Sequence, residues 1–309
     1  MLLSIVVPVF NEEESIEKFY EELEKVIIPL KEYEIIFIDD GSTDTSLQLL
    51  KAIEVQNKKV IIYSFRKNQG KAEALSYGFQ KAKGNYIATL DADLQDKPSE
   101  VLRLLPKVKT EADVVCGWRK HRQDPQLKIL SSRVFNKLAG KLWGLSLHDY
   151  NCGLKMYTSV AAKSLRLYGG LHRFIPLLAY EQGFTVIEEP VIHEQRKHGK
   201  SKYGFSKLWK DLPDIFTVLF LTKYSKRPLH FFGMVGGVLL IVGMSILFYL
   251  SVIHFQGKSI GTRPLLFFGM ILVLSGFQVF FTGFLADLIL NLSHKESREF
   301  PLKYTTEKK

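Results

Sequence analysis

Residues 86–98 read YIATLDADLQDKP. The apolar run over 86–90 stops abruptly at a polar group that comprises Asp91, Asp93, Gln95 and Asp96. A short apolar run of about four to eight residues between polar turns is typical of a buried strand. The stretch therefore predicts a strand whose carboxyl end carries concentrated negative charge, in a chain whose formal net charge is +10.

The same strand pattern recurs along the first two thirds of the chain. Further apolar runs of strand length lie at 4–10, 34–38, 60–65 and 114–117, and residues 185–192 (TVIEEPVI) have the pattern of a late strand. Between them, apolar residues at helical spacing predict helices over 11–25, 45–53, 71–82 and 98–107. Strands that alternate with helices predict an α/β fold, with a mostly parallel central sheet covered by helices on both faces.

Polar side chains follow four of the predicted strands at the point where each strand ends. They are Asn11 and Glu12 after the first strand, Asp39 after the second, Asp91 and Asp93 after the fourth, and Arg119 after the fifth. Ligands of such sheets bind outside the carboxyl ends of the strands. We therefore expect these side chains to share one site.

Asp91 and Asp93 are candidate metal ligands. Two carboxylates this close repel each other and raise each other's pKa unless a cation lies between them. Oxygen ligands favour Mg²⁺ or Mn²⁺, and Gln95 can add an amide oxygen. We expect such an ion to neutralise a leaving nucleotide diphosphate. The alternative is a solvated turn that is rich in aspartate.

Four residues near the first two strand ends are candidates for nucleotide binding. Asp39 can accept a hydrogen bond from a base or a ribose hydroxyl; the alternative, a helix-capping carboxylate, suits Asp44 better. Pro8 and Phe10 either shape a base pocket or only pack. Glu12 either holds a ribose or caps the first helix.

Arg119 and Arg133 are candidate phosphate clamps, because a guanidinium group forks onto phosphate oxygens. The alternative is a solvated basic face. Asp149 begins another polar cluster, and we expect it to act as a catalytic carboxylate or to position the acceptor. Cys116 and Cys152 lack metal-ligand spacing and give no reason to pair them, and Cys152 is interpreted as a small buried thiol.

The last third of the chain differs in composition. Residues 229–255 contain no Asp, Glu, Lys or Arg, and residues 264–292 contain one, Asp287. Both exceed the roughly 20 apolar residues that a helix needs to cross a bilayer. Residues 205–221 have the pattern of an amphipathic helix at the membrane interface or, alternatively, of a core helix. We divide the chain into an α/β domain (1–204), an amphipathic helix (205–227), a two-span segment (228–293) and a basic tail (294–309).

Basic residues flank the two predicted spans. They are Lys223, Lys226 and Arg227 before the first span, and Lys295, Arg298, Lys303, Lys308 and Lys309 after the second. Because positive charge marks the cytoplasmic side, we expect a multi-pass plasma-membrane protein with its catalytic domain and both termini in the cytoplasm. The basic balance favours an anionic membrane or phosphate ligands over nucleic acid. Gly233, Gly236, Gly237 and Gly243 permit the close helix approach of a homo-oligomer.

Five motifs occur in the order VVPVFNEEE (6–14), FIDDGSTD (37–44), ATLDADLQDKP (88–98), GWR (117–119) and DYNCGLKMY (149–157). Together they resemble glycosyltransferase family 2 with a GT-A fold. The basic loop RKHGKSKYG (196–204) and the two spans are similar to the polyprenyl-phosphate hexosyltransferases, both dolichyl-phosphate mannose synthase-like and undecaprenyl-phosphate glucosyltransferase-like.

The resemblance implies a role for each matching residue. Pro8, Phe10, Asn11, Glu12, Asp39 and Asp91 would contact the nucleotide. Asp91, Asp93 and Gln95 would hold Mg²⁺ or Mn²⁺. Arg119, Arg133 and Lys202 would meet the donor or acceptor phosphates, and Asp93, Arg119, Arg133 and Asp149 would form the catalytic set.

The reaction implied is inverting transfer of a hexose from a UDP- or GDP-sugar to undecaprenyl or dolichyl phosphate, which gives a lipid-linked sugar. The acceptor phosphate is itself an anion at neutral pH, so no dedicated general base is required. One alternative is transfer to a sugar hydroxyl in polysaccharide or glycolipid synthesis, which expects a Gln-x-x-Arg-Trp element that is absent after residue 160. The other is a non-catalytic membrane scaffold that binds a nucleotide-sugar.

Overall fold

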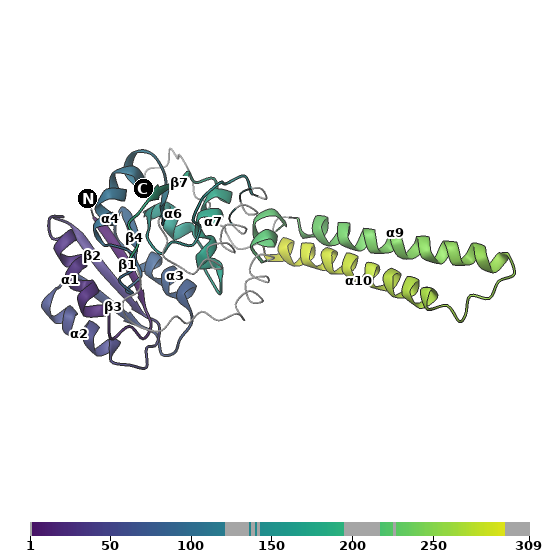
Figure 1. The fold of residues 1–309 in the computed structure, drawn as a ribbon, viewed down its shortest axis with the longest axis horizontal. Helices are drawn as coiled ribbons and strands as arrows, with labels where there is room; N and C mark the ends of the chain where they lie inside the picture. Colours follow the sequence, from purple (N-terminus) through teal and green to yellow (C-terminus); the bar gives the residue numbers. More distant parts are fainter. Residues whose placement is uncertain are drawn as a thin grey trace. The chain divides into compact units, whose positions relative to one another are not determined.

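The computed structural model describes residues 2–120, 136, 140, 143–194, 217–224 and 227–293. These residues belong to two compact units, one within residues 1–214 and one within 215–299. The first unit contains the sheet, and the second contains two long helices (Figure 1). The predicted boundary after residue 204 lies outside the described residues.

A seven-stranded sheet forms the centre of the first unit. Its strands are β1 (Leu3–Val9), β2 (Tyr33–Asp39), β3 (Val60–Ser64), β4 (Tyr86–Thr89), β5 (Val114–Trp118), β6 (Lys155–Thr158) and β7 (Val186–Pro190). The strand order is β3-β2-β1-β4-β6-β5-β7. Only β6 runs antiparallel to its neighbours, β4 and β5; the other pairs are parallel. The predicted mostly parallel sheet is confirmed.

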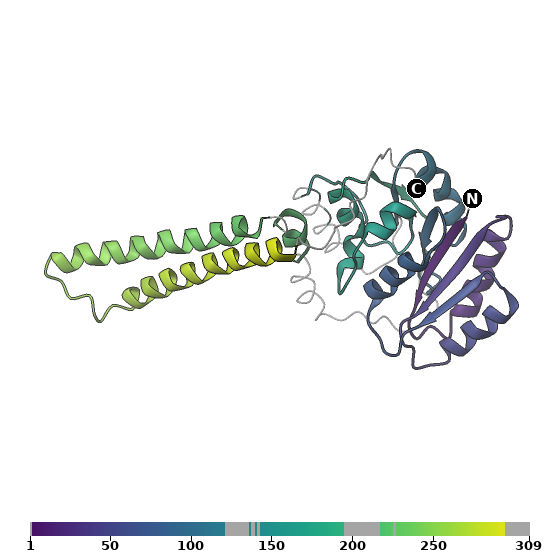
Figure 2. The ribbon, with the colours of Figure 1, turned by 180° about the vertical axis from the view of Figure 1, so that it is seen from behind.

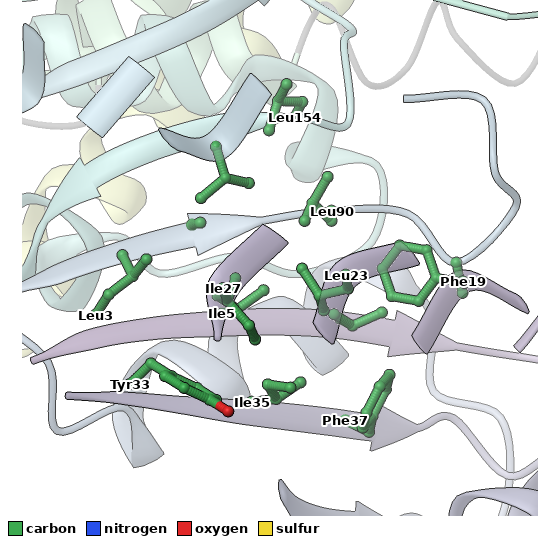
Figure 3. Packing of buried hydrophobic residues seen from close by; sticks show 14 of the residues in the cluster. Leu3, Ile5, Phe19, Leu23, Ile27, Tyr33, Ile35, Phe37, Leu90 and Leu154 are labelled. Carbon is green, nitrogen blue, oxygen red and sulfur yellow. The ribbon is translucent and has the colours of Figure 1, made fainter. Parts of the chain in front are cut away.

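Helices cover both faces of the sheet. The helices α1 (Ile16–Ile27), α2 (Ser46–Gln56) and α4 (Ser99–Thr110) share one core with the inward side chains of β1 and β2. Figure 3 shows Phe19, Leu23 and Ile27 of α1 lying over β1 and β2. All three are buried, and each contributes about 1.5–3 kcal/mol by leaving water.

The helix α3 (Lys71–Lys81) covers the opposite face, beside α6 (Ser159–Ser164). A methyl group at Gly78 would lie 2.4 Å from Cγ1 of Val6, a β1 residue that points away from the α1 core. Glycine therefore lets α3 approach the sheet closely. The segment that follows β6 continues through α6, a 3₁₀ turn η1 (Leu171–Phe174) and α7 (Ile175–Glu181).

A buried polar network fastens the amino-terminal edge of the sheet. The hydroxyl of Ser4 donates to Oε1 of Glu34 at 2.5 Å, and the Gly84 amide donates to the Ser4 hydroxyl at 2.8 Å. The Lys83 amide donates to the same Glu34 oxygen at 2.6 Å. Glu34 is only 6% exposed, so these bonds offset the cost of burying its carboxyl group.

The second unit is built on two long apolar helices, α9 (Pro228–Phe255) and α10 (Pro264–Ser293). By length and composition both could cross a membrane. They run side by side in both views (Figures 1 and 2). Before them, residues 217–224 are helical and end in a π-helical turn, η2 (Phe220–Tyr224). Most of the amphipathic helix predicted over 205–221 lies outside the described residues.

Glycines form the contact surface between α9 and α10. A methyl group at Gly236 would lie 2.7 Å from the carbonyl oxygen of Gly276, and one at Gly243 would lie 2.9 Å from the Val273 amide nitrogen. Gly237, by contrast, has no neighbour within 4 Å of an added methyl group. Two of the glycines predicted to permit oligomerisation thus pack inside the hairpin itself.

Candidate functional site

The carboxyl ends of the parallel strands lie in register. Val9 of β1 pairs with Asp39 of β2, which pairs with Ser64 of β3. On the other side of β1, Val6 pairs with Thr89, two residues before Asp91. The predicted polar clusters therefore lie along one edge of the sheet.

Asp39 lies at this edge with both carboxylate oxygens engaged. The Ser64 hydroxyl donates to Oδ2 at 2.6 Å, and the Ser42 amide donates to Oδ1 at 3.1 Å. Asp39 is 1% exposed. These bonds fix the orientation of a carboxylate that can still accept one further hydrogen bond at each oxygen.

Asn11 and Glu12 fasten the loop after β1 to the loop after β2. Asn11 adopts a left-handed backbone conformation (φ +53°), and its side-chain oxygen accepts a hydrogen bond from the Thr43 amide at 2.8 Å. The Glu12 amide donates to the Ser46 hydroxyl at 2.9 Å. The Glu12 carboxylate accepts from Ser15 at 3.0 Å, beside the start of α1. The Glu12 carboxylate thus bonds a side chain, and Ser15, the N-cap residue of α1, makes no side-chain capping hydrogen bond, so both roles of Glu12 stay predictions.

Pro8 and Phe10 flank the buried Val9 at the end of β1, and both are partly exposed. Their position leaves either reading open, so a base pocket at these two residues stays a prediction.

Asp91 is held by Lys71, the first residue of α3. The lysine Nζ lies 2.5 Å from Oδ1 and 2.7 Å from Oδ2. Burial raises the pKa of Asp91, but the charge and hydrogen bonds of Lys71, with the nearby charge of Lys155, outweigh it and leave the pKa below its usual range. A methyl group at Gly153 would lie 2.5 Å from Oδ2 of Asp91, so glycine is required behind this carboxylate.

Asp93 and Gln95 lie on either side of a strained residue. Leu94 has φ +59°, which is unfavourable for a branched side chain, and the Gln95 amide donates to Oδ1 of Asp93 at 3.2 Å. Within the described residues, no three His, Cys, Asp or Glu side chains form a ready metal site. The oxygens of Asp91, Asp93 and Gln95 nevertheless suit a hard divalent ion that takes further ligands from a phosphate.

Asp96 belongs to the same motif, but its role is structural, and the sequence did not indicate that role. It is 3% exposed, and its Oδ2 accepts a hydrogen bond from the Leu154 amide at 3.2 Å. Its Oδ1 lies 2.9 Å from Nδ1 of His193. Asp96 therefore links the loop after β4 to the segment before β6 and to the segment after β7.

Arg119 and Asp149 form a forked ion pair. Nε of Arg119 lies 2.7 Å from Oδ2 of Asp149, and Nη2 lies 3.0 Å from Oδ1. Burial lowers the pKa of Arg119, but the hydrogen bonds and charge of Asp149 outweigh it and raise this pKa above its usual range. Asp149 is 1% exposed. This geometry makes Asp149 an anchor for the guanidinium group.

His172 on η1 lies in the same charged region and was not among the predicted site residues. Burial, together with the charges of Lys71 and Arg173, lowers its pKa to about 3, so the ring is neutral at physiological pH. Lys71 follows the third predicted strand and its loop, so the edge argument could have included it. His172 follows no predicted strand, and no sequence signal pointed to it.

Two predicted site residues, Arg133 and Lys202, lie outside the described residues. Their roles stay predictions.

The family model described as "Glycosyl transferase family 2" matches residues 4–166. The dodecaprenyl-phosphate galacturonate synthase of Rhizobium johnstonii is 38% identical over 95% of this chain and 89% of its own. The undecaprenyl-phosphate 4-deoxy-4-formamido-L-arabinose transferase of Proteus mirabilis is 33% identical over 93% of this chain and 88% of its own.

Solved structures share the fold at lower identity. A mannosyltransferase from Pyrobaculum calidifontis, in complex with GDP-Man and Mn²⁺, has a TM-score of 0.52 at 16% identity and covers 95% of this chain and 88% of its own. Glucosyl-3-phosphoglycerate synthase from Mycobacterium tuberculosis, in complex with Mn²⁺ and UDP-glucose, has a TM-score of 0.53 at 16% identity and covers 72% of this chain and 78% of its own. With its GT-A-like sheet and two long apolar helices, the chain belongs to glycosyl transferase family 2.

Proposed function

We propose that the protein transfers a sugar from a nucleotide-sugar to a membrane polyprenyl phosphate, with inversion at the anomeric carbon. One observation carries the proposal: Asp91, Asp93 and Gln95 share a sheet edge with the anchored guanidinium group of Arg119, in a chain that ends in two apolar helices. The names of the similar transferases support the same acceptor class.

The names of the relatives allow a wider range of donor sugars than the sequence predicted. A hexose was expected, but the relatives are named for galacturonate and for 4-deoxy-4-formamido-L-arabinose, which is a pentose derivative. We therefore propose a nucleotide-linked sugar of either kind as the donor.

Asp39 would hold the nucleoside, and Asp91, Asp93 and Gln95 would hold Mg²⁺ or Mn²⁺. Bound there, the ion would supply positive charge to the leaving diphosphate. Arg119 would meet phosphate oxygens, and Asp149 would keep the guanidinium group in place. Arg133 and Lys202 are proposed as further contacts to phosphate.

The acceptor phosphate is the nucleophile. One of its oxygens forms a bond to the anomeric carbon while the bond from that carbon to the diphosphate oxygen breaks, and the nucleoside diphosphate leaves with the electron pair. A phosphate monoester has its second pKa near 6, so it attacks as an anion without losing a proton to the protein. Asp149 is already paired with Arg119. This pairing is consistent with a reaction that requires alignment of the reactants and no general base.

The two apolar helices indicate association with a membrane. We propose that they place the site at the cytoplasmic face of the plasma membrane, where donor and lipid acceptor meet. Assembly into homo-oligomers through the spans is part of the proposal.

The test is transfer of label into lipid. Membranes that contain the protein receive Mg²⁺ or Mn²⁺, a polyprenyl phosphate and labelled nucleotide-linked galacturonate, 4-deoxy-4-formamido-L-arabinose, glucose or mannose. We expect label from at least one donor to enter the organic phase only when the polyprenyl phosphate is present. Label that appears only in polymer would favour a sugar-hydroxyl acceptor, and no transfer from any donor would contradict the proposal.

A further inference from the structure

Lys71 occupies an unusual position for a cation. It is the first residue of α3, directly after Gly70, whose φ is +111°. The amino-terminal end of a helix carries partial positive charge, which disfavours a lysine there. The ammonium group nevertheless bends onto Asp91 and contacts both of its oxygens at 2.5 and 2.7 Å. The ion pair therefore compensates for an unfavourable placement.

This contact covers the carboxylate that the metal would use. The side chains of Lys71 and Asp91 are 35% and 30% exposed, so the pair lies at the border of the site and is reachable from solvent. Mg²⁺ binds carboxylate oxygens at about 2.0–2.1 Å, closer than the ammonium group. An ion on Asp91 would lie beside the charge of Lys71, and the two cations would repel each other.

Other positive charges near the Lys71–Asp91 pair add to the repulsion of a divalent ion. The ammonium group of Lys155, which is 3% exposed, also acts on Asp91, and Arg173 carries a further positive charge near His172. A divalent ion that arrives alone adds to a positive neighbourhood. A nucleotide diphosphate brings the negative charge that can draw Lys71 away from Asp91 and onto phosphate oxygens.

We propose that Lys71 is a resident counter-cation of Asp91 that keeps divalent ions away from this carboxylate until a nucleotide diphosphate arrives, so that metal and nucleotide diphosphate bind as one unit. The inference rests on the proposed metal-dependent function and adds an order of binding to it. Lys71 is a positioning residue in this scheme, because it acts through Asp91.

The test measures metal binding without any sugar transfer. The full chain in detergent micelles is titrated with Mn²⁺ alone, and free Mn²⁺ is followed by electron paramagnetic resonance. The same titration is repeated with UDP and with GDP. For the wild type, we expect at least one nucleotide to tighten Mn²⁺ binding roughly tenfold or more, within the usual range of coupling between sites.

Substitutions at Lys71 then decide between the proposal and a merely structural role. Lys71→Met should bind Mn²⁺ alone roughly tenfold more tightly than the wild type, with a smaller effect of nucleotide. Lys71→Arg keeps the cation and should behave like the wild type. The matched control, Lys81→Met, removes an exposed lysine from the other end of α3 and should change nothing.

Lys71→Gln keeps a hydrogen-bond donor for Asp91, so it provides a second neutral variant if Lys71→Met does not fold. Mn²⁺ affinity that is unchanged or weaker in a folded neutral variant would overturn the proposal. The Mn²⁺ titration contains no acceptor and no sugar, so it is independent of the transfer assay. If transfer failed but the neutral Lys71 variants still bound Mn²⁺ more tightly, only the proposed function would be rejected.

Discussion

Asp93 is the residue on which the proposed metal site depends most. It lies on the loop after β4, and the left-handed Leu94 turns the backbone between Asp93 and Gln95. We expect Asp93→Asn to lower transfer at least about 100-fold, since it removes a charged ligand from the leaving-group side. The variant should keep the unfolding temperature of the wild type, because the amide has nearly the same shape.

The matched control for that variant is Glu54→Gln, which neutralises an exposed acid on α2. Its transfer rate should equal that of the wild type. Full activity of Asp93→Asn would refute the metal role.

The ion pair of Arg119 and Asp149 depends on the fork of the guanidinium group. Arg119→Lys keeps the charge but cannot meet both oxygens of Asp149 in the same fork, so the buried pair loses one of its two charge-assisted hydrogen bonds. We expect a loss of about 1–3 kcal/mol in the free energy of unfolding, together with a lower transfer rate.

Arg166→Lys is the control, because Arg166 is an exposed arginine of the same unit. Substitutions of exposed side chains usually change stability by less than about 0.5 kcal/mol, so this variant should leave both readouts nearly unchanged. Equal effects at Arg166 and Arg119 would contradict the special status of the buried fork.

His172 gives the first unit a specific sensitivity to acid. Its pKa is about 3 in the folded chain against the ordinary 6.5, because burial and the charges of Lys71 and Arg173 disfavour its protonation. Between these two values the unfolded chain binds a proton that the folded chain does not. Stability contributed by the neutral ring is therefore fully present above about pH 6.5 and falls by roughly 1.4 kcal/mol per unit as the pH decreases towards 3.

His172→Gln removes the side chain that takes up this proton on unfolding. The unfolding temperature in detergent, measured from pH 7 to pH 4, should fall less steeply for the variant than for the wild type. Carboxylates contribute to acid unfolding in both proteins, so the difference between the two slopes is the measured quantity. Parallel slopes would show that His172 is not buried as a neutral group.

At the scale of elements, the long apolar runs were predictable and the short segments were not. β1, β2, β3, β4, β5 and β7 all fall on predicted strand segments. For the mostly buried β1, β2, β4 and β5 the reason is that a strand buried on both faces is apolar along its length. β6 was missed because it has four residues and begins with Lys155, whose buried ammonium group donates to the Cys152 carbonyl. The helices α6 and α7 are too short to show a helical period.

The hairpin of α9 and α10 provides a prediction at the same scale. A β-branched side chain at position 276 would meet Cγ of Leu240 at 2.8 Å and the Gly236 carbonyl oxygen at 2.9 Å. Gly276→Val should therefore lower the stability of the hairpin by about 1–3 kcal/mol through overpacking. Thermal unfolding in detergent measures this loss.

Gly237→Val is the matched control, because its added methyl group meets nothing within 4 Å in the hairpin. Both substitutions replace a helical glycine with the same residue, so intrinsic helix propensity cancels in the comparison. If Gly237→Val were the more harmful variant, a contact with another molecule at that face would explain it, as expected for an oligomer.

At the scale of the whole molecule, the sequence predicted which strand ends would meet but not which side chains would pair. Asp91 joins Lys71 across 20 positions, Arg119 joins Asp149 across 30, and Asp96 joins His193 across 97. Such pairs arise from the folding of the sheet and from segments without a strand signal. The residue types and their common edge follow from the sequence, whereas the division into ligand, anchor and counter-cation requires the structure.

Membrane topology connects the two units to the proposed reaction, because donor and acceptor phosphate must meet on one side of the bilayer. In the proposed topology both spans are inserted, so the connection between α9 and α10 would face outward and the α/β unit would face the cytoplasm. Lys258→Cys lies in that connection, and Val55→Cys lies on α2 at a position that is 75% exposed. The two native cysteines, Cys116 and Cys152, are fully buried and give little background.

A membrane-impermeant maleimide applied to intact cells should therefore label Lys258→Cys and leave Val55→Cys unlabelled until the cells are permeabilised. Permeabilisation then serves as the internal control for the reactivity of Val55→Cys. Labelling of Val55→Cys in intact cells would place the α/β unit on the wrong side for a cytoplasmic nucleotide-sugar. If Lys258→Cys reacted only after permeabilisation, the hairpin would not cross the bilayer, and the helices would have to lie in the interface or pack against protein.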